Sequence, residues 1–174
     1  LNTGYKELNI PANADATHKL DKNSFHIWPR GEFTLIALPN LDGSFTCTLF
    51  MPFEGENSFE QLNTKELVQQ FFEKHFPDTI AVIPELVTDF FKNPTSSLVT
   101  MKCYPWVFKD KIALIGDSAH AIVPFYGQGM NAGFEDVTIL AEMMNTYGND
   151  WEKVLDEYQK SRKRDSRQWY NNSH

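Results

Sequence analysis

One stretch of the chain, residues 112–136, has residue types and spacings that could hold a cofactor. It reads IALIGDSAHAIVPFYGQGMNAGFED, so an apolar run ends in Gly116 and Asp117, and a glycine-bracketed loop then opens a helix. Glycines let backbone N–H groups approach a ligand closely, and a helix N-terminus favours an anion or an electron-rich carbonyl edge. A carboxylate at a strand end can accept hydrogen bonds from sugar-like hydroxyls. The pattern predicts a cofactor cradle, but not a P-loop, because no Gly-Lys-Ser/Thr follows.

Other side chains with possible chemistry give weaker signals. His120 could serve as a base near neutral pH, but a structural place in the turn is the preferred interpretation. Arg30, within a Pro-Arg-Gly turn, could meet an anionic ligand, although an arginine in a turn more often faces solvent. His18 and His75 show no ligand spacing, so no metal site is expected.

Composition restricts the class of protein. The 174 residues are 41% hydrophobic and 22% charged, which is typical of a soluble globular domain, and no apolar run reaches the length of a membrane span. A net charge of −7 argues against a nucleic-acid partner. One basic cluster lies near the C-terminal end and predicts a solvated helix face, with a membrane-surface or partner contact as the alternative. Its members are Lys160, Arg162, Lys163, Arg164 and Arg167.

The elements that must position the cradle begin with a sheet. Short β-branched or aromatic runs separated by Pro/Gly/Asn/Asp turns predict an antiparallel meander over 25–28, 33–38 and 44–51, and residues 1–22 are expected to be an irregular lead-in. Strand alternation puts two sets of side chains on one face each. The sets are Thr34, Ile36 and Leu38, and Thr46, Thr48 and Phe50.

Helical periodicity replaces alternation after this sheet. Asn63 and Glu66 form a capping-box pattern that predicts a helix ending before Pro77, and a second helix is expected at about 84–91. A strand is predicted over 98–106 and a buried parallel strand over 111–115. Two helices, roughly 129–145 and 151–164, close the chain. The fold class is therefore α/β (α+β), with a mixed or antiparallel sheet and helices, followed by a strand–loop–helix unit.

The stretch that forms the cradle resembles a known fingerprint. Group A flavoprotein monooxygenases, relatives of p-hydroxybenzoate hydroxylase, carry G-D-A-A-H, then Pro, then G-x-G-x-N and a later Asp. The matching residues here are Gly116-Asp117-Ser118-Ala119-His120, Pro124, Gly127-Gln128-Gly129-Met130-Asn131, Gly133 and Asp136.

The resemblance implies roles for individual residues. Asp117 would bind the ribityl chain of FAD, and the backbone of 129–131 would meet the pyrimidine end of the isoalloxazine. Pro124 and Phe125 would lie at the flavin edge where oxygen reacts. The residues implied to bind cofactor are Asp117, Pro124, Gly127, Gly129, Met130 and Asn131.

A narrower resemblance is to the branch of this family that hydroxylates kynurenine at the ring 3-position. It rests on residues 26–31 with the run to Phe50, and on the loop 124–131. The likeness covers most of residues 24–164. Tyr126 stands where relatives often carry His, so no role for that imidazole is transferred. No side chain is implied to be a catalytic nucleophile. The residues implied to bind substrate are Ile36, Leu38, Phe50, Pro124, Phe125 and Gln128.

The resemblance therefore implies FAD- and NADPH-dependent hydroxylation of an aromatic amino acid by O2, most narrowly L-kynurenine to 3-hydroxykynurenine. Another group A hydroxylase or epoxidase, or a non-catalytic flavin-fold interaction module, remains the alternative. A substrate-binding domain is expected over 23–108, and the C-terminal part of the FAD-binding domain over 109–174.

The family's G-x-G-x-x-G and middle D-G fingerprints do not occur in the sequence, so this chain is expected to be an incomplete catalyst. The resemblance also implies the cytosolic face of the outer mitochondrial membrane, with attachment through a segment outside this chain.

Overall fold

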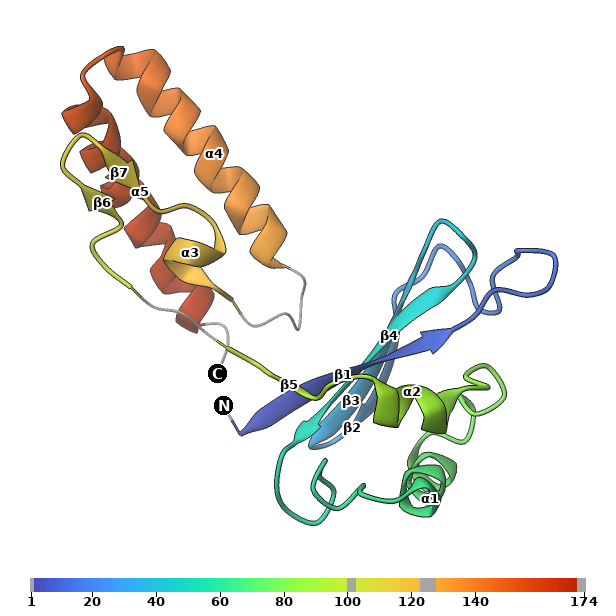
Figure 1. The fold of residues 1–174 in the computed structure, drawn as a ribbon. Coiled ribbons are helices and arrows are strands. Elements are labelled where there is room, and N and C mark those ends of the chain that lie inside the picture. Colours follow the sequence, from blue (N-terminus) through green and yellow to red (C-terminus); the bar gives the residue numbers. More distant parts are fainter. Residues whose placement is uncertain (1, 100–102, 123–127, 172–174) are drawn as a thin grey trace. The chain divides into compact units, whose positions relative to one another are not determined.

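The computed structural model describes residues 2–99, 103–122 and 128–171, with side chains described up to residue 164. The chain divides into two compact units, Leu1–Leu98 and Val99–His174 (Figure 1). Within the described residues, no helix combines the length and the apolar character needed to cross a membrane. The predicted fold class, mixed α/β with an antiparallel sheet, is confirmed.

The first unit is built on a five-stranded sheet with the order β2-β3-β4-β1-β5. The predicted meander is confirmed as β2 (His26–Arg30), β3 (Phe33–Pro39) and β4 (Phe45–Pro52), each antiparallel to the next. The short β5 (Ser96–Ser97) completes one edge of the sheet.

The irregular lead-in expected over residues 1–22 is wrong for its first third. Residues Thr3–Ile10 form β1, which pairs with β4 along its whole length. Lys6, Leu8 and Ile10 are buried, while Glu7 and Asn9 are exposed, so the segment alternates as a half-buried strand does. Its polar composition and its partner some forty positions later along the chain concealed it.

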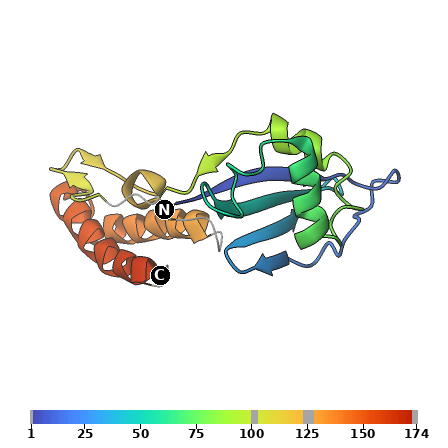
Figure 2. The same cartoon turned by 90° about the horizontal axis from the view of Figure 1, so that it is seen from below.

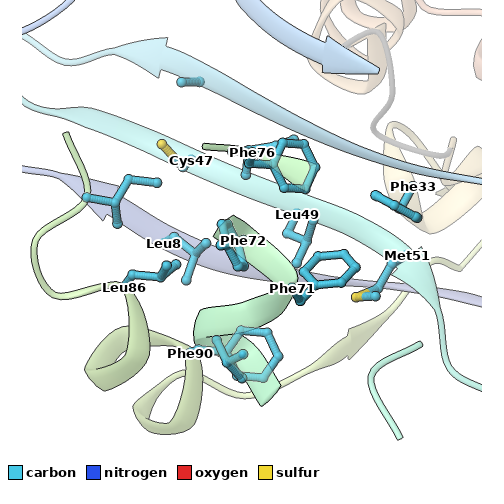
Figure 3. Packing of buried hydrophobic residues seen from close by; sticks show 14 of the residues in the cluster. Leu8, Phe33, Cys47, Leu49, Met51, Phe71, Phe72, Phe76, Leu86 and Phe90 are labelled. Carbon is cyan, nitrogen blue, oxygen red and sulfur yellow. The ribbon is translucent and has the colours of Figure 1, made fainter. Parts of the chain in front are cut away.

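Two helices, α1 (Lys65–His75) and α2 (Leu86–Lys92), cover one face of this sheet (Figures 1 and 2). Leu35 and Leu49 from the sheet and Phe72 from α1 are each fully buried in the shared core. Figure 3 shows Phe71 and Phe72 of α1 and Phe90 of α2 among strand residues such as Leu49. The face of the sheet opposite α1 and α2 is called the outer face below.

Arg30 has a structural place in the first unit. Its Nε donates a hydrogen bond to the backbone oxygen of His75 at 2.6 Å, and its guanidinium lies 5.2 Å from the centroid of the Phe76 ring. A cation that binds the last carbonyls of a helix also complements the helix dipole. Arg30 therefore links the end of β2 to the end of α1, while 34% of its side chain stays exposed, so the expected solvent-facing position holds in part.

The helix predicted after residue 63 is confirmed, but its cap lies one residue later. Thr64 is the N-cap of α1, and its Oγ1 accepts the Leu67 N–H at 3.3 Å. The Asn63 side chain instead donates to the backbone oxygen of Glu60. Both residues are good caps, and the backbone conformation decided between them.

Thr64→Ala is expected to lower the free energy of unfolding by about 1 kcal/mol, because an orphan N–H of the first turn loses its acceptor. Asn63→Ala serves as the matched control and should change it by no more than about 0.5 kcal/mol. Urea denaturation of both variants measures the difference. A larger loss from Asn63→Ala would return the cap to the position expected from the sequence.

In the part of the second unit that the structure describes, a small hairpin is followed by three helices. β6 (Val107–Phe108) and β7 (Ile112–Ala113) pair antiparallel, and α3 (Asp117–His120) follows. The two predicted closing helices are confirmed as α4 (Gln128–Tyr147) and α5 (Trp151–Asn171), which lie side by side (Figures 1 and 2).

Two predicted strands differ from those observed. Among the described residues of 98–106 there is no strand, and the buried parallel strand expected over 111–115 is only the two-residue β7. Ile112 is 56% exposed and Ile115 is 41% exposed. A buried parallel strand needs neighbours on both sides and layers on both faces. Within the described residues, the partner of β7 is the short antiparallel β6.

Candidate functional site

The turn that carries Asp117 depends on a glycine. Gly116 adopts φ 59° and ψ −144°, a conformation that residues with a Cβ rarely enter. Its carbonyl accepts the N–H groups of Ala119 and His120 at 2.9 and 3.0 Å. The chain therefore turns sharply into α3, and the exposed carboxylate of Asp117 stands at its first position, where the sequence predicts a cofactor ligand.

The first turns of α4 lie directly against this turn. A Cβ built on Gly129 would lie 3.6 Å from Asp117 Oδ1, and one built on Gly133 would lie 3.8 Å from Gly116 Cα. The two glycines, one helical turn apart, thus face the turn that bears the carboxylate. Asp117 and the N-terminal end of α4 therefore lie next to each other, which is the arrangement that the predicted cofactor site needs.

The other predicted residues on α4 are accessible at the same end of the helix. Met130 is 68% exposed, and the Asn131 side chain donates to Gln128 Oε1 at 3.1 Å. Gln128 and Asn131 also line an open pocket of ≈ 380 Å³, together with Ile122, Ala132 and Glu135. Three of the predicted cofactor and substrate residues thus present polar or exposed groups beside Asp117.

A buried carboxylate on α4 joins the helix to the turn. Asp136 Oδ2 lies 2.7 Å from His120 Nε2 and accepts the Gly116 N–H at 2.7 Å, while its Oδ1 accepts Arg162 Nε at 2.6 Å. Asp136 and Arg162 are 0% exposed and His120 is 1% exposed. This supports the structural interpretation of His120, because its imidazole is enclosed and directed at a carboxylate of the fold.

The environment of Asp136 keeps it ionised. Burial alone would raise the pKa of this carboxyl, but the hydrogen bonds from His120, the Gly116 N–H and Arg162 outweigh burial and lower it. At neutral pH, a charged acceptor therefore accepts the Gly116 N–H that begins this turn.

Two members of the basic cluster near the C-terminal end lie in different environments, and the side chain of Arg167 lies outside the described residues. Lys160 fits the expected solvated face, since it is exposed and pairs with the exposed Asp156 and Glu157. The expectation is wrong for Arg162, which is fully buried. Helical spacing could have revealed this, because a buried stripe leads to it along α5. That stripe consists of Val154, Leu155, Tyr158, Gln159 and Arg162.

The predicted substrate residues on the sheet share one face. In the β3–β4 register Thr34 opposes Phe50, Ile36 opposes Thr48, and Leu38 opposes Thr46. These side chains are on the outer face, whereas Phe33, Leu35 and Ala37 fill the core.

Tyr5 is an outer-face residue that the sequence interpretation missed. It opposes Phe50 across β1 and β4, with ring centroids 6.3 Å apart. The alternation of buried and more exposed residues along β1 is the signal that would have identified Tyr5.

Four residues of the loop that precedes α4 lie outside the described residues: Pro124, Phe125, Tyr126 and Gly127. Their implied roles at the flavin edge and in the substrate pocket stay predictions. Within the second unit, the structure brings Asp117, Gly129, Met130 and Asn131 to one end of α4.

The amino-acid sequence has close relatives along nearly all of its length. It is 77% identical over 163 residues to a protein named kynurenine 3-monooxygenase from Flavobacterium johnsoniae, covering 94% of this chain and 36% of that protein. A protein of the same name from Flavobacterium psychrophilum is 71% identical over 166 residues, covering 95% of this chain and 37% of the relative. The chain thus spans a little over a third of the length of these curated relatives.

Solved structures share the fold at low identity. Pseudomonas aeruginosa PqsL in complex with 2-aminobenzoylacetate matches with a TM-score of 0.72 and 18% identity, over 97% of this chain and 46% of that one. Klebsiella pneumoniae HpxO complexed with FAD and uric acid matches with a TM-score of 0.66 and 15% identity, over 92% and 40%. A family model described as FAD binding domain matches residues 8–173. The fingerprint around Asp117 and this match agree, and the chain belongs to the FAD binding domain family.

Proposed function

We propose that this chain supplies the substrate-side sheet and the ribityl and isoalloxazine side of the FAD site in an NADPH-dependent monooxygenase that converts L-kynurenine to 3-hydroxykynurenine. The observation that carries the proposal is the Asp117 carboxylate held against Gly129 at the start of α4. That arrangement occurs in a chain 77% identical to a protein named kynurenine 3-monooxygenase.

The residues of the second unit fit FAD. Asp117 is exposed and can accept hydrogen bonds from the ribityl hydroxyls. The first turn of α4 has N–H groups without helical partners, and Gly129 to Asn131 present them to the electron-rich pyrimidine edge of the flavin. The loop residues Pro124 and Gly127 would complete the site.

FAD, once reduced by NADPH, supplies the activation of O2 from which one oxygen atom reaches the aromatic ring. The residues of this chain bind, orient and shield. Ile36, Leu38 and Phe50 of the outer face are proposed to offer the substrate an apolar wall, because flat apolar walls suit an aromatic ring and exclude water. Pro124 and Phe125 are proposed substrate contacts on the resemblance alone. Gln128 would bind a polar group of the amino-acid substrate. The chemistry requires no nucleophilic side chain.

Kynurenine is expected to accelerate NADPH oxidation by the protein that carries this chain and to yield 3-hydroxykynurenine. The rate of NADPH loss and the chromatographic detection of product measure this, with a simple phenol as the comparison substrate. Stimulation and hydroxylation with the phenol alone would favour another group A hydroxylase. FAD binding without turnover of any arene would favour the non-catalytic interaction module.

The cellular location is a separate proposal. Outer mitochondrial attachment, implied by the resemblance, applies only in a cell that has mitochondria, and the relatives of 77% and 71% identity come from Flavobacterium, a bacterial genus. An aromatic substrate and O2 are the partners that the proposed reaction requires in either setting.

A further inference from the structure

Arg162 is a fully buried cation that the proposed chemistry does not use. It is the largest of the side chains with almost no exposure. Two of its guanidinium nitrogens donate hydrogen bonds to α4, and the third forms an ion pair with α4. Nε donates to Asp136 Oδ1 at 2.6 Å, Nη1 lies 2.8 Å from Glu135 Oε2, and Nη2 donates to the Ala132 carbonyl at 3.2 Å. One side chain of α5 therefore holds three residues within the first turns of α4.

The contact continues into the turn that bears Asp117. Asp136 offers Oδ1 to Arg162 and Oδ2 to both the Gly116 N–H and His120. Arg162 thereby fixes the orientation of this carboxylate, and the backbone N–H of Gly116 donates a hydrogen bond to the other oxygen of the same carboxylate. Gly116 directly precedes Asp117. A rotation of the Asp136 carboxylate would therefore displace the turn that carries Asp117, the residue proposed to bind the ribityl chain.

Helix α5 also holds the strand that leads into the turn. The Tyr158 hydroxyl donates to the Leu114 carbonyl at 3.2 Å, and Gln159 Oε1 accepts the Trp106 N–H at 2.7 Å. Both residues belong to the buried stripe that ends at Arg162. The same helix face thus contacts the chain before the turn and, through Asp136, the turn itself.

We propose that Arg162 is a positioning residue of the flavin site, which sets the separation and orientation of Asp117 relative to the N-terminal turn of α4 through Asp136. The proposal rests on the FAD-binding function proposed above. A buried ion pair contributes little net stability compared with apolar side chains of similar volume. We therefore assign the Arg162–Asp136 pair the role of fixing the orientation of the groups around it. The planar guanidinium, with donors in a fixed fork, defines that orientation as a lysine ammonium cannot.

The decisive variant is Arg162→Lys in the protein that carries this chain, because it keeps the charge and loses the fork. The probe is FAD itself, titrated into apo-protein at a temperature at which wild type and variants are fully folded. Under that condition a change in stability cannot alter the dissociation constant. The readouts are flavin fluorescence for the dissociation constant and the visible absorption spectrum of the bound flavin for its surroundings.

Arg162→Lys is expected to raise the dissociation constant for FAD about tenfold or more, the equivalent of one displaced charge-assisted hydrogen bond, and to change the spectrum of the bound flavin. Lys160→Met is the matched control, since it removes an exposed cation two residues away on α5, and it should leave both readouts unchanged. Glu135→Ala removes the half-exposed partner of Nη1 and should change the flavin spectrum in the same direction by a smaller amount.

Wild-type affinity and spectrum in Arg162→Lys would overturn the proposal. If Arg162→Lys does not fold, Glu135→Ala decides, and an unchanged spectrum in that variant would reduce Arg162 to a stabilising role. Failure of the proposed function gives a different pattern. Wild-type protein that does not bind FAD would end both proposals, whereas FAD binding without kynurenine turnover would leave the assignment of Arg162 intact.

Discussion

Asp117→Ala should yield purified protein with little or no FAD. The carboxylate stands exposed at the first position of α3, 3.6 Å from the position that a Cβ would take on Gly129, and we propose that it binds the ribityl chain there. A hydrogen bond to a charged group contributes about 1.5–3 kcal/mol, so losing one or two such bonds weakens binding at least about tenfold. The flavin-to-protein absorbance ratio and a fluorescence titration with FAD measure the loss.

Two further variants calibrate this result. Asp110→Ala removes an exposed carboxylate from the β6–β7 turn of the same unit and should retain full flavin content. Asp117→Asn keeps one acceptor oxygen and should retain an intermediate affinity. An undiminished FAD content in Asp117→Ala would show that Asp117 does not bind FAD. It would also contradict the roles that the fingerprint assigns to individual residues.

Asp136→Ala is expected to cost about 3–5 kcal/mol of stability in the second unit, because breaking a buried ion pair leaves an uncompensated charge. Arg162, with 0% exposure, loses the acceptor of Nε, and the Gly116 N–H loses its acceptor as well. Chemical denaturation or amide hydrogen exchange in α4 and α5 reports the loss. Asp156→Ala is the control, since its pair with Lys160 is exposed and contributes at most about 1 kcal/mol.

The same variant predicts a dependence on pH. Burial raises the pKa of Asp136, but the hydrogen bonds from His120, Gly116 and Arg162 prevail, so the folded-state pKa lies below its ordinary value of 3.8. A group with a lowered folded-state pKa stabilises fully above its unfolded pKa and loses that stabilisation as pH falls through the folded one. The stability gap between wild type and Asp136→Ala should therefore narrow below pH 3.8. A gap that stays constant in acid would contradict the assigned ionisation.

Local signals in the sequence predicted the meander and the long helices well. Turn residues such as Gly31 and Gly43 adopt positive φ and separate the strands, and the alternation between them fixes which side chains share a face. The segments with weaker local signals were the ones misplaced. β1 has polar residues at half its positions and is recognisable as a strand through its pairing with β4. The strand expected over 111–115 pairs, among the described residues, with the short β6 alone.

The sequence alone predicted the turn at Gly116–Asp117 and the start of the helix that follows it. Gly116, Asp117 and Gly129 form a fingerprint because the backbone conformation of a turn and the start of a helix are set by residues adjacent in the chain. Only the tertiary structure decided the environment of Arg162, which composition places on a solvated face and packing places beside Asp136. It also decided that Tyr5 joins Phe50 on the outer face. Burial and cross-strand pairing depend on which distant segments exclude water from one another, and a pattern within a single segment does not contain that information.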